Sequence, residues 1–547
     1  MTLTPEIIRK YESEGTWPNR SLIEIFDEVV RRTPDKIAIV GPDGRRMTYA
    51  EVAGKVDRIA GNLAAAGVQA RDVISLQVPN WPEFVLVHLA ATRLGAVTNP
   101  LLPNYRSKEL SFILKFASSK VAVIPATFRG FDYPGMYAEL KKELPDLRQI
   151  YAIGSDAPDG MTPFAELLEE PKSHIRPAPP GPPDYNEVTL LVFTSGTEST
   201  PKGVMHSHNT LMYSTAAMAR LLGLTSEDVV WTASPLGHGT AFEWGMRQAL
   251  VIGGTLVLQD IWDVENALKI IERERCTFTL AATPFASMLL ESPTLDQYDL
   301  SSFRIFACAG APIPEKLGEA FRRRIGCTLI GMWGMTECFV GSASPPDDRT
   351  EKLWKTDGKA MPGAELAIFD ATRSKQLPPG EVGELATRGP HVCLGYFNDP
   401  QRTRDTFSDD GWLFSNDLAT IDAEGYIRLV GRKKDVINRG GLKVSVREVE
   451  ELLLQQGSIV SVALVAVPDE RLGEKGCAFV VPRDDARLTL PQLVRYLEDR
   501  GVAKYKLPEY LVVLREFPMT ASGKIQKFKL REDFVNGKYG PQRSAVS

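Results

Sequence analysis

The chain has 547 residues, 43% of them apolar and 24% charged, which indicates a globular protein of more than one domain and excludes a disordered or fibrous one. Its net charge of -5 lacks the basic excess that nucleic-acid binding requires. The six cysteines form no CxxC pair, so we expect neither a disulfide framework nor a zinc site, but buried free thiols in a reducing cytosol.

The N-terminus has no apolar segment of the secretory type, and the most apolar stretch, residues 250–258, is too short to span a bilayer. We therefore predict a soluble, cytoplasmic protein without an integral membrane segment. The sequence leaves its oligomeric state open.

Amphipathic helices alternate with short apolar strands over several hundred residues. Thr48 and Glu51 form a capping-box pattern before a helix, Gly67 ends that helix, and residues 73–78 follow as a buried strand. The apolar face of this helix consists of Val52, Val56, Ile59 and Leu63. Helix and strand recur at residues 267–275 and 278–281, and at residues 316–324 and 328–332. This alternation predicts an α/β fold with layered, largely parallel sheets.

Two boundaries interrupt this pattern. The proline-rich residues 171–183 predict an extended connector, and a charged run follows Gly431. We predict a large N-terminal domain, residues 1–431, and a small mobile α+β C-terminal domain, residues 432–547. The elements expected in the small domain are helices at 446–456 and 490–500 and strands at 460–467 and 478–482.

The segment TSGTESTPKG, residues 194–203, follows a strand predicted for residues 188–193. Hydroxyl groups and free backbone N–H groups at the end of a strand can surround phosphate oxygens, and Lys202 adds positive charge. Because Gly203 follows the lysine, the loop is not a Walker A motif. Taken alone, the segment fits a phosphate-binding loop and a small polar turn equally well.

This loop resembles the signature TSGTTGxPKG of the adenylate-forming superfamily, which includes acyl-CoA synthetases, aryl-acid ligases and luciferases. Glu198 and Ser199 depart from it, and the variant looks most like bacterial short- and medium-chain acyl-CoA synthetases and cyclohexanecarboxylate–CoA ligases. A carboxylate would repel triphosphate, so we expect Glu198 to point outward or to pair with a cation. The resemblance implies ATP contacts by Thr194, Ser195, Gly196, Thr197 and Lys202.

Further motifs follow in the family's order. GMWGMTE, residues 331–337, is similar to the family's YGxTE segment, and the resemblance implies that Trp333 stacks on adenine and that Glu337, with Thr194, holds Mg²⁺. SND, ending at Asp417, stands where the family has TGD, which implies hydrogen bonds from the ribose to Asp417. Asn416 replaces a glycine there, and asparagine tolerates a left-handed backbone. The other implied ATP contacts are Gly310, Ala311, Pro312, Met332, Gly334, Met335 and Thr336.

GRKKDVINRGGLK, residues 431–443, is similar to the hinge between the family's two domains. The resemblance implies a second ribose contact for Arg432 and the hinge position for Lys434. The glycine pair allows the close backbone approach that the pantetheine arm of coenzyme A needs, and it consists of Gly440 and Gly441. For the neighbouring Lys433 and Asp435 we expect only a solvated linker.

PMTASGKIQK, residues 518–527, closes the series and presents Lys524. In the family, this lysine reaches the carboxylate and the α-phosphate during adenylation, so the implied catalytic residues are Lys524, Lys202 and Glu337. The implied activity is that of an acid–thiol ligase: with ATP and Mg²⁺ it forms an acyl-adenylate and passes the acyl group to coenzyme A. No carrier domain follows the lysine motif, so free coenzyme A is the expected acceptor.

The acid itself is less well defined. The residues similar to the family's acyl pocket mix small and bulky side chains, which fits an apolar acid of modest size, alicyclic or short- to medium-chain. They are His238, Gly239, Trp244, Ala282 and Thr283. We expect His238 to be a gate or pocket wall, since a carboxylate needs no general base near pH 7. Alternatives are an aryl-acid–CoA ligase, a stand-alone adenylation enzyme that loads a carrier protein, and a nucleotide-binding regulatory protein without catalysis.

Overall fold

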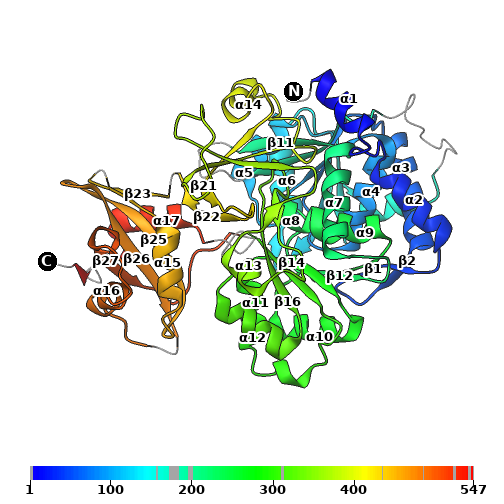
Figure 1. Cartoon of the computed structure of the whole chain (residues 1–547). Coiled ribbons are helices and arrows are strands. Elements are labelled where there is room, and N and C mark those ends of the chain that lie inside the picture. Colours follow the sequence, from blue (N-terminus) through cyan, green and yellow to red (C-terminus); the bar gives the residue numbers. More distant parts are fainter. Residues whose placement is uncertain are drawn as a thin grey trace.

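The computed structural model covers the chain as a large body and a smaller lobe, the latter running from β23 (Ile437–Arg439) to α17 (Lys527–Val535) (Figure 1). The structure describes residues 4–154, 158–171, 184–194, 201–309, 313–433, 435–440, 442–483, 486–520 and 525–539, and the backbone of 544–545. The connector predicted at residues 171–183 lies outside them, apart from Pro171.

The largest sheet is parallel in its centre and antiparallel at both edges. Its central strands are buried along almost their whole length, as parallel strands covered by helices on both faces must be. Its strands, in order across the sheet, are β18 (Lys359–Ala360), β17 (Ser342–Ala343), β16 (Thr328–Trp333), β15 (Ile305–Ala309), β14 (Phe278–Ala281), β12 (Val229–Thr232), β13 (Thr255–Leu258), β1 (Ile37–Val40) and β2 (Arg46–Thr48).

The helices predicted beside this sheet are confirmed. They are α10 (Val264–Glu274) and α12 (Glu315–Ile325), each within a few residues of the expected bounds. The next strand in each case, β14 or β16, pairs in parallel with β15, so these units are the helix-connected parallel strands that the alternation predicts.

A second sheet carries the predicted phosphate-binding segment at one edge. The capping box of Thr48 and Glu51 is present at the start of α3 (Tyr49–Ala65), the apolar face of that helix is buried, and Gly67 follows with a φ of +88°. The strands of this sheet, in order, are β11 (Lys202–Ser207), β10 (Val188–Thr194), β4 (Val97–Pro100), β3 (Val73–Leu76), β5 (Val121–Pro125), β8 (Gln149–Ile153) and β9 (Thr162–Pro163).

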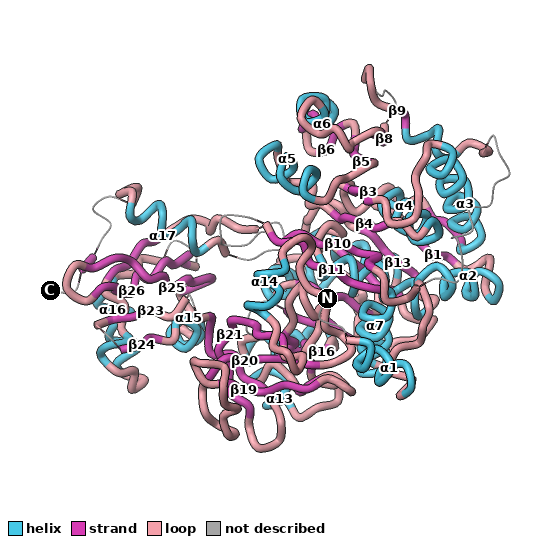
Figure 2. The backbone as a smooth tube through the Cα atoms, turned by 90° about the horizontal axis from the view of Figure 1, so that it is seen from above, coloured by secondary structure: helices cyan, strands magenta, loops and turns pink. Residues whose placement is uncertain are grey.

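An antiparallel sheet lies on the side of the body that faces the smaller lobe (Figures 1 and 2). It consists of β19 (Glu365–Phe369), β20 (Gly383–Arg388), β21 (Leu413–Ile421) and β22 (Ile427–Arg432). Its last strand therefore ends at the segment that the sequence marks as the hinge.

The smaller lobe has its own sheet and its own apolar core. The four elements predicted for it are confirmed with shifted ends. Its sheet contains β24 (Leu442–Val444), β23, β26 (Gly473–Pro482), β27 (Tyr510–Val513) and β28 (Ser544–Ala545), with β25 (Ile459–Asp469) paired to β26, and its helices include α15 (Val446–Leu454) and α16 (Leu490–Glu498). Arg447 of α15 forms an ion pair of 3.2 Å with Asp357 of the body. The domain boundary at 431/432 stays a prediction.

All six cysteines are free and buried, as expected. Within the described ranges, every helix is either too short or too polar to cross a bilayer.

Candidate active site

Three segments bring the predicted site residues together. Trp333 is the last residue of β16, Lys202 is the first residue of β11, and Asp417 lies within β21. Because β10 and β11 pair in an antiparallel hairpin, Thr194 and Lys202 are directly opposite each other. The loop between them, with Ser195, Gly196 and Thr197, lies outside the described residues.

Lys202 reaches the buried carboxylate of Glu337. Its Nζ lies 2.9 Å from Oε1 of Glu337, whose side chain is only 3% exposed. The hydroxyl of Tyr396 donates a hydrogen bond of 2.6 Å to the same oxygen. Burial and the neighbouring Glu337 carboxylate raise the pKa of Tyr396, so the phenol stays protonated and remains a donor. A buried carboxylate is stable only with such partners.

The donor set suits Mg²⁺. The hydroxyl oxygen of Thr194 is buried and has no hydrogen-bond partner among the described residues, which leaves a hard oxygen available beside the Lys202 end of the hairpin. In the described part of the chain, no cluster of three or more His, Cys, Asp or Glu side chains could hold a metal by itself. Mg²⁺ needs no such cluster, since it usually combines one or two carboxylates with waters and substrate phosphates. Glu337 and Thr194 fit that pattern.

Asp417 is held from two sides. The indole N–H of Trp333 donates a hydrogen bond of 2.8 Å to Oδ2, and Nε of Arg432 lies 3.1 Å from Oδ1. Asp417 and Arg432 are also register partners of β21 and β22. Trp333 is 3% exposed, so its contact in this structure is with the carboxylate, and adenine stacking stays a prediction. Asn416 has a φ of +61°, the left-handed conformation that asparagine tolerates.

The segment between Trp333 and Glu337 is fixed by a hydrogen bond and by a close backbone approach. Nε2 of His206 donates a hydrogen bond of 2.7 Å to the carbonyl of Thr336, and burial lowers the pKa of His206 to about 4, so the ring is neutral. A side chain on Gly334 would lie 1.8 Å from the carbonyl oxygen of Phe339, so only glycine fits there.

A cavity of about 90 Å³ adjoins this segment. Trp244 and Phe339 meet edge to face in its wall, with ring centroids 6.5 Å apart. Thr283, at the start of α11 (Thr283–Glu291), is buried but does not line it. The predicted residues that do line it are His238, Gly239, Trp244, Ala282, Met332, Gly334, Met335 and Thr336.

Of the remaining predicted residues, Gly440 is described by the structure. Gly440 has a φ of +59°, and its N–H donates to the carbonyl of Leu472 at 2.8 Å. Its role toward coenzyme A stays a prediction. The predicted residues outside the described part of the chain, besides Ser195, Gly196 and Thr197, are Gly310, Ala311, Pro312, Lys434, Gly441 and Lys524.

The expectation that Lys433 is only a solvated linker residue is wrong. Its Nζ lies 2.7 Å from Oε2 of Glu384, whose side chain is fully buried in the four-stranded sheet. The run of charged residues in this segment indicates an exposed linker, and a sequence pattern does not show a partner 49 positions away.

Comparison with known proteins decides the family. A family model described as AMP-binding enzyme matches residues 26–397, and a second, described as AMP-binding enzyme C-terminal domain, matches residues 448–524. The chain belongs to the AMP-binding enzyme family. The resemblance, the mixed α/β fold and the enzyme class, an AMP-forming acid–CoA ligase, are confirmed with it.

Relatives of this AMP-binding enzyme differ in the acid that their names give. It is 39% identical to a medium-chain fatty-acid–CoA ligase of Escherichia coli K12, over 96% of this chain and 92% of the relative. It is 31% identical to a 2,3-dihydroxybenzoate-AMP ligase of Bacillus subtilis, over 96% of each chain. Among solved structures, an anthranilate CoA ligase in complex with anthranoyl-AMP has a TM-score of 0.87 at 25% identity, covering 95% of this chain and 98% of that one.

Sequence reasoning missed Tyr396, His206 and Phe339 in this AMP-binding enzyme. His206 had a detectable signal, since it stands four residues after Lys202, on the strand that leaves the predicted phosphate loop. Tyr396 and Phe339 had none, because each contributes through a contact that only the fold creates.

Proposed function

We propose that this enzyme activates a compact apolar carboxylic acid with ATP as its acyl-adenylate, and then transfers the acyl group to coenzyme A with release of AMP. One observation carries the proposal: the ion pair of Lys202 with the buried Glu337 lies in the same site as Asp417, which Trp333 and Arg432 hold, and a small cavity adjoins that site. Charge for a triphosphate, an acceptor for a ribose and space for an acyl group thus occur in one site.

The chain's own residues bind, orient and stabilise charge in this scheme. The carboxylate oxygen of the acid attacks the α-phosphorus, pyrophosphate leaves, and the thiol then attacks the carbonyl and releases AMP, so no protein nucleophile is needed. Lys202 and Lys524 supply positive charge to the developing transition state, and Asp417 with Arg432 orients the ribose. When bound by Glu337 and Thr194, Mg²⁺ supplies further neutralisation of the phosphate oxygens.

The two half-reactions require two positions of the small domain. We assign residues 1–431 to the ATP- and acid-binding domain and residues 432–547 to a domain that turns about Lys434, bringing first Lys524 and then the Gly440–Gly441 segment to the site. A Lys524→Ala variant is therefore expected to lose pyrophosphate exchange yet still convert supplied acyl-adenylate to thioester. Equal loss of both half-reactions would contradict this division.

The cavity supports an acid of modest size. Its volume of about 90 Å³ is well below the ~300–1,000 Å³ that is common for ligand pockets, and two aromatic rings lie in its wall. A compact alicyclic acid such as cyclohexanecarboxylate, or a short- to medium-chain fatty acid, requires less enlargement of this cavity than a long chain does. The second candidate is an aryl acid, and the likeness to an anthranilate CoA ligase favours it.

An acid panel tests the proposal. Pyrophosphate exchange is measured with cyclohexanecarboxylate, hexanoate, octanoate, palmitate, benzoate and anthranilate, and each active acid is then assayed for thioester formation with coenzyme A. The proposal predicts exchange and thioester with compact non-aromatic acids and neither with palmitate. Exchange with aryl acids alone supports the second candidate. Exchange without thioester indicates an enzyme that loads a carrier protein, and no exchange with any acid refutes catalysis.

A further inference from the structure

One fully buried carboxylate joins the ribose-binding region to the end of the hinge strand. Glu384, in β20, has a side chain with no exposed surface. The guanidinium of Arg373 donates to both of its oxygens, at 2.9 and 2.8 Å, and Nζ of Lys433 donates to Oε2 at 2.7 Å. The backbone N–H of Asn416 donates to Oε1 at 3.1 Å. We call these four residues the Glu384 cluster.

The first contribution of the cluster is to a bulge in β21. Phe414 pairs with Ala386 and Leu418 pairs with Glu384, so three residues of β21 lie opposite one residue of β20. A bulge leaves N–H groups outside the ladder, and buried N–H groups need partners. Glu384 accepts the N–H of Asn416, and the hydroxyl of Ser415 accepts the N–H of Asp417 at 3.0 Å.

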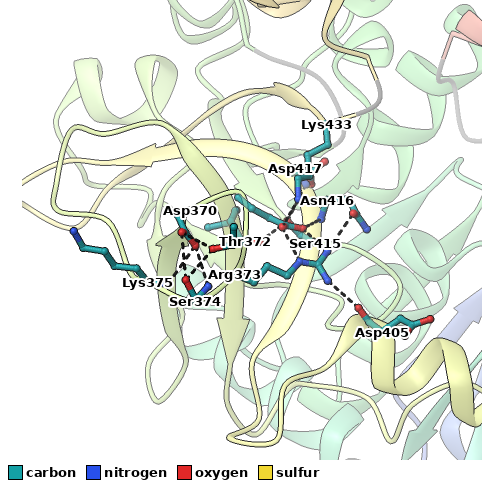
Figure 3. Close-up of polar contacts among 12 residues, drawn as sticks. Asp370, Thr372, Arg373, Ser374, Lys375, Asp405, Ser415, Asn416, Asp417 and Lys433 are labelled. Atoms are coloured by element: carbon teal, nitrogen blue, oxygen red, sulfur yellow. Dashed lines mark hydrogen bonds and ion pairs between the residues drawn. The ribbon is translucent and has the colours of Figure 1, made fainter.

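This bulge sets the direction of Asp417. The left-handed φ of +61° at Asn416 turns the chain between its two neighbours, and Asp417 then faces Trp333 and Arg432. Figure 3 shows Arg373 reaching from its turn toward Asn416, a contact of 3.4 Å, and toward the carbonyl of Asp405 at 2.8 Å. The cluster thus supports the backbone that carries the ribose-binding carboxylate.

The second contribution is to the strand that leads into the hinge. The N–H of Lys433 donates to the carbonyl of Asn416 at 3.0 Å, so both the backbone and the side chain of Lys433 are bonded to the body. The next described residues differ. The N–H groups of Asp435 and Val436 donate to the carbonyl of Arg432 within the same turn of the chain, and from Ile437 the chain belongs to the sheet of the smaller lobe.

Charge balance makes the cluster sensitive to the loss of one member. Burial opposes ionisation of Glu384, but the hydrogen bonds and charges of Arg373 and Lys433 outweigh it and lower the pKa of the carboxyl. Removing the lysine leaves the bidentate arginine, so the carboxylate stays paired. Removing the carboxylate leaves two cations, Arg373 and Lys433, and the N–H of Asn416 without their acceptor, which is costlier.

We propose that Glu384 is a positioning residue that couples the ribose-binding carboxylate to the hinge. Through Asn416 it orients Asp417. Through Lys433 it holds the chain to the body, so that the small domain turns about the residues after Lys433. This proposal rests on the domain rotation in the proposed function. Fewer freely rotating residues at the hinge limit the orientations that the small domain samples. The conformational entropy lost on reaching each productive orientation is therefore smaller.

The test combines distance measurement with nucleotide binding. Val382 and Val460 are exposed, on the body and on the smaller lobe, and the native cysteines are buried, so the Val382→Cys, Val460→Cys protein accepts one spin label on each part. In this background Lys433→Met should broaden the distribution of distances between the labels while leaving AMP affinity, measured by calorimetry, unchanged. Both half-reactions should slow by about 5- to 30-fold, the cost of ordering one more residue.

Lys375→Met is the matched control. Lys375 lies in the turn beside Arg373 and points away from the cluster (Figure 3), and its replacement removes the same charge as Lys433→Met does. This control should match the parent protein in every measurement. Glu384→Gln should, in contrast, weaken AMP binding and broaden the distances together.

Two results would overturn the proposal. In one, Lys433→Met has a distance distribution as narrow as that of Lys375→Met. In the other, Lys433→Met loses AMP affinity and thermal stability in parallel, as a purely structural ion pair would require. Label distances and AMP binding need no acid substrate, so a failure of the proposed function in the acid panel is distinguishable from a failure here.

Discussion

Replacing Tyr396 with phenylalanine removes one hydrogen-bond donor to the buried carboxylate of Glu337, which we assign to Mg²⁺. In the structure, that hydroxyl donates at 2.6 Å to Oε1 of Glu337, and Lys202 lies 2.9 Å from the same oxygen. A hydrogen bond to a buried charged group contributes about 1.5–3 kcal/mol, which corresponds to roughly 10- to 150-fold. Because Lys202 remains, we expect the lower end, about tenfold.

The loss of activity in Tyr396→Phe should be confined to the first half-reaction, the adenylation of the acid. We assign Glu337 to the Mg²⁺ that accompanies ATP, and Tyr396 and Lys202 are the described donors that hold its carboxylate, so the loss of one donor should affect adenylation. We expect kcat/KM for ATP in pyrophosphate exchange to fall about tenfold at limiting Mg²⁺ and to recover in part at saturating Mg²⁺. The conversion of supplied acyl-adenylate to thioester should not change.

Tyr213→Phe is the matched control, because that tyrosine is also buried and its hydroxyl donates to the carbonyl of Pro362, away from Glu337. Tyr213→Phe should lower the thermal midpoint of unfolding about as much as Tyr396→Phe does, and it should leave pyrophosphate exchange unchanged. If Tyr396→Phe leaves exchange intact as well, or if it slows both half-reactions equally, the assignment of Tyr396 to the orientation of Glu337 is wrong.

Three further predictions concern nucleotide binding, acid size and pH. Trp333→Phe removes the indole N–H that donates to Asp417, so the affinity for AMP, measured by calorimetry, should fall about tenfold. An unchanged affinity would contradict the assignment of Asp417 to ribose binding. Phe339→Ala enlarges the cavity, so the optimum of exchange should move to longer acids; an unmoved optimum would place the acyl group elsewhere. Burial lowers the pKa of His206 to about 4 and of His391 to about 3, below the usual 6.5. The unfolded chain therefore binds more protons below pH 6.5, and stability, complete above that pH, falls by up to about 1.4 kcal/mol per pH unit for each histidine as the pH drops toward 4. The thermal midpoint should fall accordingly, less so in His391→Gln, and a midpoint independent of pH would contradict this.

The sequence predicts most of the fold because the features that determine it are local. The capping box at Thr48 and the apolar face of α3 lie at one helix, and the parallel strands are short, mostly apolar segments. Strand ends are less predictable. β25 runs from Ile459 to Asp469, beyond the predicted 460–467, because its pairing with β26 continues through residues that are not apolar.

The site divides in the same way. Lys202, Glu337 and Asp417 are recognisable because motif spacing marks them, and the structure brings Lys202 to Glu337 and Asp417 to Trp333. Contacts such as Tyr396 with Glu337, 59 positions apart, arise only when the body folds. The role of Lys433 was misjudged for that reason, since its partner Glu384 lies in a different strand of the four-stranded sheet.

An isotope measurement tests the central claim, activation of the acid as its acyl-adenylate, most directly. The preferred acid is prepared with ¹⁸O in both carboxylate oxygens and turned over with ATP and coenzyme A, and the released AMP and pyrophosphate are analysed by mass spectrometry. Because a carboxylate oxygen attacks the α-phosphorus and stays on it when the thiol displaces AMP, the account predicts one ¹⁸O in each AMP and none in pyrophosphate. AMP without the label would contradict it.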